Sequence, residues 1–147
     1  MTDLFRQADI DRMIGHLRAM GAPFGITFAD RPFLSNSHAA LIAAEFARDR
    51  GKFQEVHEAI FAAYFSRALD IGDPAVLSDI VQEAGIEPSL LAEAVKDTTY
   101  AARLQQAQKM ASDAGVTGVP TFVIDNKRTI VGAQPLDVFR KALTKKK

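Results

Sequence analysis

Strand-forming residues gather in only one part of this sequence, near its C-terminal end. Residues 121–125 are rich in β-branched and aromatic side chains, residues 126–128 predict a turn, and residues 129–131 supply a second short strand. Gln134 and Pro135 then predict the start of a terminal helix. The rest of the chain shows helical periodicity broken by loops. The sequence therefore predicts several helices, then one β-hairpin, then one helix.

The helical region has its clearest periodicity in residues 53–64, where apolar side chains recur at i, i+3, i+4, i+7, i+8 and i+11. These side chains are Phe53, Val56, His57, Ile60, Phe61 and Tyr64. A stripe this wide predicts a central helix that is buried against other elements. A first helix is expected to end near Gly21, and a second covers residues 39–47 after candidate caps at Ser35, Asn36 and Ser37. Two more helices are expected to begin at Asp73 and at Glu87, and a long one runs from caps at residues 97–99 to Ala114.

The predicted hairpin is short of neighbours. Residues 121–124 form a continuous apolar run, which is typical of a strand that is covered on both faces. A lone two-stranded hairpin is marginally stable in water. Residues 24–28 are a weak candidate for a further strand, because Gly25 interrupts them. The hairpin is therefore expected to pair with strands that this sequence does not supply.

Composition argues against several classes of function. The chain carries 18 basic and 18 acidic residues, so its net charge gives no basis for binding nucleic acid or an anionic membrane. It has no cysteine, and therefore no thiolate nucleophile and no cysteine-ligated zinc. Residues 1–6 lack the apolar run of a signal peptide and no stretch resembles a membrane span, so a cytoplasmic location is expected. The lysines at 145–147 predict a solvated tail.

Other residues that often carry chemistry are better explained structurally. His57 lies in the apolar stripe, where a hydrogen-bonded core or boundary histidine is the simpler interpretation. His16 and His38 are distant from it in sequence, and none of the three forms a zinc-binding spacing. Gly115 and Gly118 are not followed by the lysine and hydroxyl residue of a phosphate loop. We therefore expect no metal, no cofactor and no catalytic residue.

Three short motifs carry a resemblance to a known family. Residues 70–74 read Asp-Ile-Gly-Asp-Pro, residues 115–124 read Gly-Val-Thr-Gly-Val-Pro-Thr-Phe-Val-Ile, and residues 132–135 read Gly-Ala-Gln-Pro. Asn36 and Ser37 precede an alanine-rich helix. Together these features resemble the DsbA-like thioredoxin-fold family over roughly residues 10 to 143. The nearest branch is the FrnE type, related to 2-hydroxychromene-2-carboxylate isomerases and kappa-class glutathione transferases.

The resemblance implies an α/β thioredoxin-like fold that is incomplete. In that family a helical insertion interrupts the thioredoxin fold, after an N-terminal unit that carries Cys-x-x-Cys. This chain resembles the insertion, over residues 1–114, followed by the closing β-β-α unit, over residues 115–147. The N-terminal redox unit has no counterpart in the sequence. The family activity is protein disulfide oxidoreduction, and this chain is expected to be inactive alone because it has no cysteine.

The resemblance also implies a substrate loop formed by Thr117, Gly118, Val119 and Pro120. In the family the bond before the matching proline is cis, which would present the backbone of Val119 to an extended peptide or thiol substrate. Gly118 is expected to supply a backbone conformation reserved for glycine. The residues alone also fit a Pro120 that merely begins a strand in trans.

Three hypotheses follow for function. The first is a truncated or degenerate member of the thiol–disulfide oxidoreductase family. The second is a binding module whose hairpin, residues 121–131, pairs with a second copy of the chain or with a separate redox unit. The third, which the sequence favours least, is a glutathione-dependent isomerase or transferase. Light scattering separates the first two, because strand sharing requires an oligomer.

Overall fold

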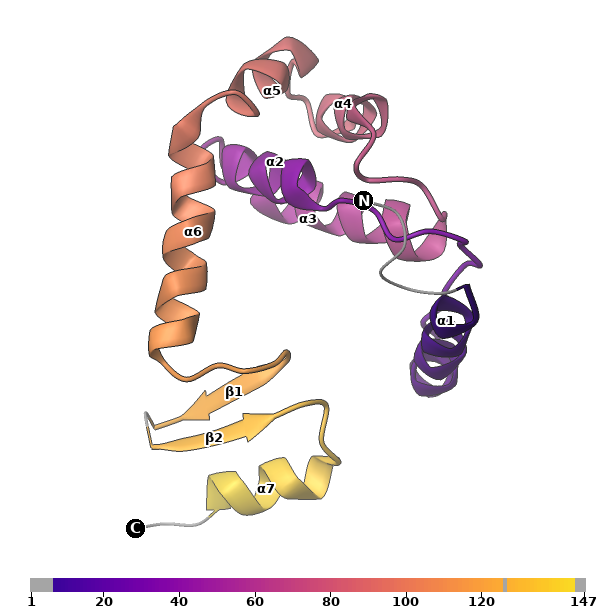
Figure 1. Cartoon of the computed structure of the whole chain (residues 1–147), viewed down its shortest axis with the longest axis vertical. Coiled ribbons are helices and arrows are strands. Elements are labelled where there is room, and N and C mark those ends of the chain that lie inside the picture. Colours follow the sequence, from indigo (N-terminus) through magenta and orange to yellow (C-terminus); the bar gives the residue numbers. More distant parts are fainter. Residues whose placement is uncertain (1–6, 126, 145–147) are drawn as a thin grey trace. The chain divides into compact units, whose positions relative to one another are not determined.

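The computed structural model describes residues 7–125 and 127–144, and the expectations for residues 1–6 and 145–147 lie outside them. The element order is the predicted one, with helices first, then the hairpin and a terminal helix (Figure 1). The elements are α1 (Gln7–Gly21), η1 (Ala22–Phe24), α2 (His38–Arg48), α3 (Phe53–Phe61), η2 (Ala62–Ser66), α4 (Pro74–Glu83), α5 (Pro88–Ala94), α6 (Thr98–Asp113), β1 (Thr121–Ile124), β2 (Arg128–Val131) and α7 (Leu136–Thr144). None of the helices in the described ranges is long and apolar enough to cross a membrane.

The chain divides into two compact units. The first covers residues 1–104 and the second covers residues 105–147, so the division falls within α6. The organisation expected from the sequence, 1–114 and 115–147, placed the change at the end of this helix instead. Each unit is described below by itself.

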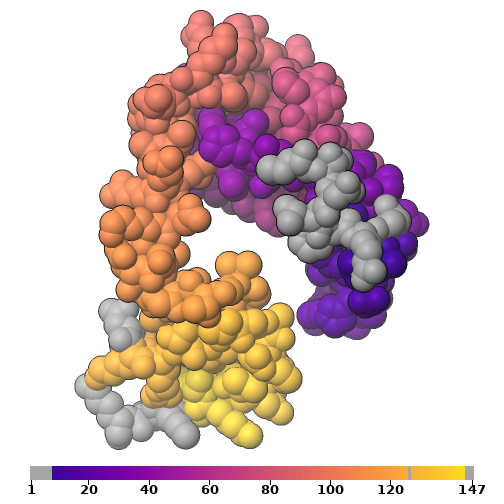
Figure 2. Space-filling view, in the orientation of Figure 1, coloured from indigo at the N-terminus to yellow at the C-terminus, as the bar shows by residue number. Residues whose placement is uncertain are grey.

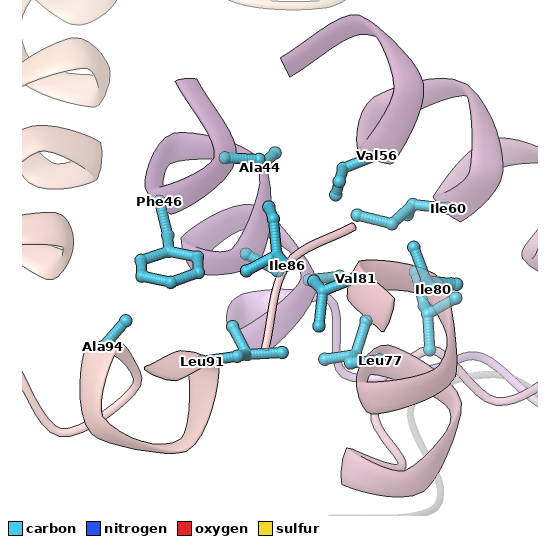
Figure 3. Close-up of a cluster of buried hydrophobic side chains, with 14 of the residues drawn as sticks. Ala44, Phe46, Val56, Ile60, Leu77, Ile80, Val81, Ile86, Leu91 and Ala94 are labelled. Atoms are coloured by element: carbon cyan, nitrogen blue, oxygen red, sulfur yellow. The ribbon is translucent and has the colours of Figure 1, made fainter. Parts of the chain in front are cut away.

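The first unit is built around the alanine-rich helix α2. This helix packs against α3, α4 and α5, and small side chains on it allow the close approach of its neighbours. The largest fully buried side chains of the unit come from α2, α3 and α4; they are Phe46, Ile42, Leu77, Val56 and Val81. Figure 3 shows Phe46, Leu77, Val56 and Val81 among the clustered side chains. Leu91 and Ala94 of α5 belong to the same cluster, so one hydrophobic core joins four helices.

The apolar stripe of α3 is only partly buried. Val56 and Ile60 belong to the core, as the periodicity predicts. The prediction was wrong for Phe61, which is 52% exposed. The reason is that Phe61 lies about 100° around the helix from Ile60, so the row from Phe53 through His57 to Phe61 follows the edge of the buried face and not its centre. The rings of this row stack on one another instead, with centroids 5.1 Å and 4.7 Å apart.

A π-helical turn, η2, follows α3 and anchors the loop between η1 and α2. Its wider turn is closed by the Arg67 N–H, which donates to the Ala62 carbonyl at 3.0 Å. The carbonyl of Phe65 accepts from the Ala29 N–H at 2.8 Å. The guanidinium of Arg31, a buried residue, lies 3.8 Å from the centroid of the Tyr64 ring. The weak strand candidate at residues 24–28 forms no strand in the described residues, since its only backbone bonds there are turn bonds to Gly21 and Ala22.

Side-chain caps expected from the sequence are present at the starts of α4 and α2. The Asp73 side chain caps α4 by accepting from the Ala75 N–H at 2.9 Å, as expected. Ser37 occupies the N-cap position of α2 but makes no side-chain cap bond. The neighbouring Asn36 takes that role, because its Oδ1 accepts from the His38 N–H at 3.0 Å.

Candidate functional site

The hairpin of the second unit has one face against α7. β1 and β2 are antiparallel, with Phe122 opposite Ile130. The Phe122 ring meets the Phe139 ring of α7 edge to face, with centroids 4.8 Å apart, and Ile130 is buried. Arg128 on the same face donates from Nη1 to the Ala142 carbonyl. The hairpin and α7 thus form a single β-β-α unit, drawn from orange to yellow in Figure 2.

The opposite face of the hairpin is open in the described residues. Val123 is 53% exposed and Val131 is 44% exposed. Their side chains lie on the face away from α7, because side chains alternate along a strand. Within the described residues α7 covers one side only, and no further strand pairs with the hairpin. This agrees with the shortage of strands expected from the continuous apolar run 121–124, and the coverage of the second face stays a prediction.

The loop before β1 is held at both ends and free in the middle. At its start, the Gly115 N–H donates to the Ser112 carbonyl at 2.9 Å and closes α6. At its end, the Gly132 N–H donates to the Pro120 carbonyl at 2.7 Å. The Thr121 hydroxyl donates to the Gly118 carbonyl at 2.5 Å. The loop geometry is thus fixed by bonds that leave Val119 out.

Val119 is largely exposed to solvent in this loop. Its relative exposure is 89%, and the peptide bond that joins it to Pro120 is cis. Within the described residues, neither its N–H nor its carbonyl makes a hydrogen bond. Thr117 is also exposed. Gly118 has an ordinary φ, so the expected glycine-only conformation is absent there, and a Cβ would meet Val131 at 3.6 Å, which is normal contact.

The histidines expected to be structural are not assembled into a reactive group. His57 is stacked between Phe53 and Phe61, whereas His16 and His38 are exposed. Among the described residues, no three histidine or acidic side chains are placed to hold a metal ion. The chain contains no thiol. The arrangement can therefore present a backbone to a partner, but it brings together no nucleophile with a base.

The groups with resolved pKa shifts belong to the first unit, and none of them is a residue of the 117–120 loop. The pKa of Asp49 is lowered, chiefly because the Arg103 guanidinium donates to its carboxylate at 2.7 Å. The pKa of Asp97 is lowered because the Thr99 N–H donates to it at the start of α6. Both carboxylates belong to the first unit. Asp49 forms an ion pair with Arg103, and Asp97 caps the start of α6.

Comparison with known proteins decides the family. A model of the DsbA-like thioredoxin domain matches residues 4–144. The chain belongs to this family. Its fold is accordingly the thioredoxin-like DsbA fold, which confirms the predicted fold class, with seven α-helices and a small two-stranded antiparallel sheet in the described residues.

Two known proteins are similar to this DsbA-like chain. The crystal structure of a probable DsbA oxidoreductase from Streptomyces coelicolor is similar, with a TM-score of 0.74 and 27% sequence identity over 94% of this chain. The uncharacterized protein YwbO of Bacillus subtilis is 35% identical over 100 residues, or 67% of this chain. The matches span 58% of the Streptomyces chain and 50% of YwbO, so this DsbA-like chain corresponds to about half of each relative's length.

Sequence reasoning missed one concave feature of the first unit. Side chains from the end of α2, from α5 and from the start of α6 line a cavity there, among them Phe46, Arg50, Glu93 and Tyr100. The acidic members Glu93 and Asp97 are four residues apart, which is the one signal available in the sequence. Nothing in the sequence indicates that Arg50 lines the same concave feature.

Proposed function

We propose that this chain is the substrate-binding and helical part of a DsbA-like protein and performs no thiol–disulfide exchange by itself. The observation that carries the proposal is the exposed backbone of Val119, free of hydrogen bonds in the described residues, in a chain without cysteine. The motif residues 115–124 and 132–135 support a place near the FrnE-type branch. The proposal includes a cytoplasmic location, in line with the sequence expectation.

The missing chemistry is specific. Exchange of a disulfide requires a thiolate that attacks one sulfur while the other leaves as a thiolate. No side chain of this sequence can form the mixed disulfide, because serine and threonine hydroxyls do not exchange with disulfides. We propose that a separate Cys-x-x-Cys redox unit supplies the thiols.

The free backbone at Val119 suits an extended peptide. A peptide in β conformation can donate to the Val119 carbonyl and accept from its N–H, as an added strand does at a sheet edge. The exposed Val123 and Val131 offer an apolar surface close along the chain. Affinity would come mainly from main-chain bonds, so the loop would accept varied sequences.

An insulin-reduction assay tests the absence of redox activity. The chain, at micromolar concentration with dithiothreitol, should precipitate insulin no faster than dithiothreitol alone. A DsbA-type oxidoreductase with its Cys-x-x-Cys motif is the positive control. Any rate above the dithiothreitol background would overturn the proposal of an inactive chain.

The loop is tested with a peptide that has no redox chemistry. Carboxymethylated insulin B chain, labelled with a fluorophore, is titrated with the wild-type chain, Val119→Ala and Val119→Pro. Val119→Ala should bind within about threefold of the wild type, because the backbone remains. Val119→Pro removes the N–H and should weaken binding by about tenfold, the loss of roughly one hydrogen bond. Equal affinity for the proline and alanine variants would refute backbone pairing.

A second candidate is a homodimer formed through the 121–131 hairpin. The observation that favours it is that the sheet in the described residues consists of β1 and β2 alone, so each strand has an unpaired edge. Two such hairpins could form one four-stranded sheet around a two-fold axis. Size-exclusion chromatography with light scattering decides this, and a monomer at every concentration tested would count against strand sharing.

A further inference from the structure

Arg31 is the one charged residue that is buried among the described residues. It is 4% exposed and lies between η1 and α2, in the first unit. Its guanidinium carbon lies 3.8 Å from the centroid of the Tyr64 ring and 5.0 Å from the centroid of the Phe65 ring. The Val119 loop belongs to the second unit, so whatever Arg31 binds is independent of the proposed function.

The positive charge of Arg31 is not neutralised by any carboxylate of the described residues. Asp30, its neighbour in the sequence, pairs with Arg18 instead, at 2.8 Å. Contact with aromatic rings offsets only part of the cost of removing a guanidinium from water. Buried charges in proteins are therefore normally paired. Arg31 thus has the surroundings of a residue that takes its counter-ion from a ligand.

The hydrogen-bond donors of Arg31 show which edge of the guanidinium is available. Nη1 donates to the Tyr64 carbonyl at 3.4 Å, which is a long bond. Nε is buried and has no hydrogen-bond partner, and Nη2 donates to no atom within the described residues. The N–H groups of Nε and Nη2 point in parallel from one edge, and this spacing matches the two oxygens of a carboxylate. The unused edge is therefore one that makes bidentate pairs.

The segment that carries Arg31 is held by few bonds. Residues 26–37 form neither helix nor strand, and residues 30–35 make no backbone–backbone hydrogen bond within the described part of the chain. Ser35 has a second buried polar atom without a partner, its Oγ. Segments with few hydrogen bonds open at a low cost in free energy. A shift of this segment can therefore uncover Nε without unfolding the core of α2 to α5.

We propose that the Nε–Nη2 edge of Arg31 binds a carboxylate group. A carboxylate is planar and carries one negative charge, so it balances the single charge of Arg31 and pairs with both N–H groups. A phosphate carries close to two charges, and the neighbouring cation Arg18 is already paired with Asp30. The carboxylate comes from a small free acid or from an acidic side chain of a bound polypeptide, and experiment separates these sources.

The test is a titration of the isotope-labelled full chain with sodium acetate, followed by NMR at the Nε–Hε signal of Arg31. Sodium chloride at equal ionic strength is the control. Acetate should shift the signal saturably, with a dissociation constant on the order of 1–10 mM, and phosphate should bind more weakly. The proposal is overturned by equal shifts with acetate and chloride, by no saturable shift, or by phosphate binding more tightly than acetate.

Two blocked hexapeptides that differ only in a central aspartate or asparagine separate the two sources of the carboxylate. If a polypeptide supplies it, the aspartate peptide should bind about tenfold more tightly than acetate, through its additional contacts. If a small acid supplies it, acetate should bind at least as tightly as the aspartate peptide. Both results support a carboxylate site. An asparagine peptide that binds as tightly as the aspartate peptide would refute it.

Arg31→Lys tests the edge itself. Lysine keeps the charge and lacks the paired N–H groups, so acetate binding should weaken about tenfold. Binding to this variant is followed by the rise of the urea unfolding midpoint in acetate relative to chloride. Arg12→Lys is the control, because the Arg12 side chain is 80% exposed in the same unit. An equal rise in both variants would contradict the assignment, and the wild-type titration decides the proposal where Arg31→Lys is too unstable to measure.

Discussion

Replacing Phe46 by alanine should destabilise the first unit more than any other aromatic truncation in it. Phe46 is 2% exposed and is the largest of the fully buried side chains. Its ring also contacts two other side chains. The Tyr100 ring centroid lies 5.9 Å from the Phe46 ring centroid, and the guanidinium carbon of Arg50 lies 3.6 Å from it. Truncation removes both ring contacts and leaves a cavity where the buried ring was.

The expected magnitude follows from burial. A Phe→Ala change in a well-packed core costs about 3–5 kcal/mol. A whole domain is stable by about 5–15 kcal/mol, so this one change removes a large share of the total. Phe61→Ala is the matched control, because the same atoms are deleted from a side chain that is 52% exposed. Full burial of a phenylalanine is worth about 1.5–3 kcal/mol, so Phe61→Ala should cost roughly half of that.

The assay is urea unfolding followed by tyrosine fluorescence. Both tyrosines of the chain, Tyr64 and Tyr100, belong to the first unit, so the signal reports on that unit alone. The free energy of unfolding should fall by at least about 2 kcal/mol more for Phe46→Ala than for Phe61→Ala. Equal losses, or a larger loss for Phe61→Ala, would falsify the burial assigned to the two rings.

Three further perturbations have defined outcomes. Asp49→Asn should lower the free energy of unfolding above pH 3.8, where the Asp49 carboxylate is charged and paired with Arg103. The difference from the wild type should vanish as the pH falls through the lowered pKa of the folded state, because the carboxyl group is then protonated in both folded and unfolded chains. A pH series of unfolding curves followed by fluorescence checks this. Gly85→Ala should lower the free energy of unfolding by about 1–2 kcal/mol, because φ is +80° there. Gly15→Ala within α1 should raise it by about 0.5–1 kcal/mol. Neither new Cβ meets another atom, so urea titration of the two variants measures the conformational preference of the backbone alone. Asp73→Ala should cost about 1 kcal/mol through the lost cap of α4, and Asp73→Asn should restore it in the same titration.

Much of the fold could be predicted because the signals are local. Asp73 before Pro74 marks the start of α4, and the β-branched run at residues 121–124 marks β1. Gly21 and Gly115 mark helix ends in the same way. Each of these signals depends only on residues that are close together in the sequence, so it can be interpreted without knowing the tertiary structure.

The remaining features depend on what lies next to a residue in space. The exposure of Phe61 depends on which face of α3 its neighbours cover, and periodicity alone does not define that face. The cavity beside Arg50 joins three helices, and no spacing within one of them predicts it. The loop at Val119 was located correctly through family motifs, whereas its role in binding stays a prediction.

The π-helical turn has a consequence for how the chain tolerates changes in length. Its carbonyls at Tyr64 and Phe65 accept hydrogen bonds from Arg31 and Ala29. The turn therefore fixes the alignment of two segments that are more than thirty residues apart along the chain. Deleting one residue of this turn would restore an α-helical pitch and swing those carbonyls about 100° around the axis. A loop of the same unit could lose a residue and keep its ends in place, but here a single deletion would release a whole connecting segment.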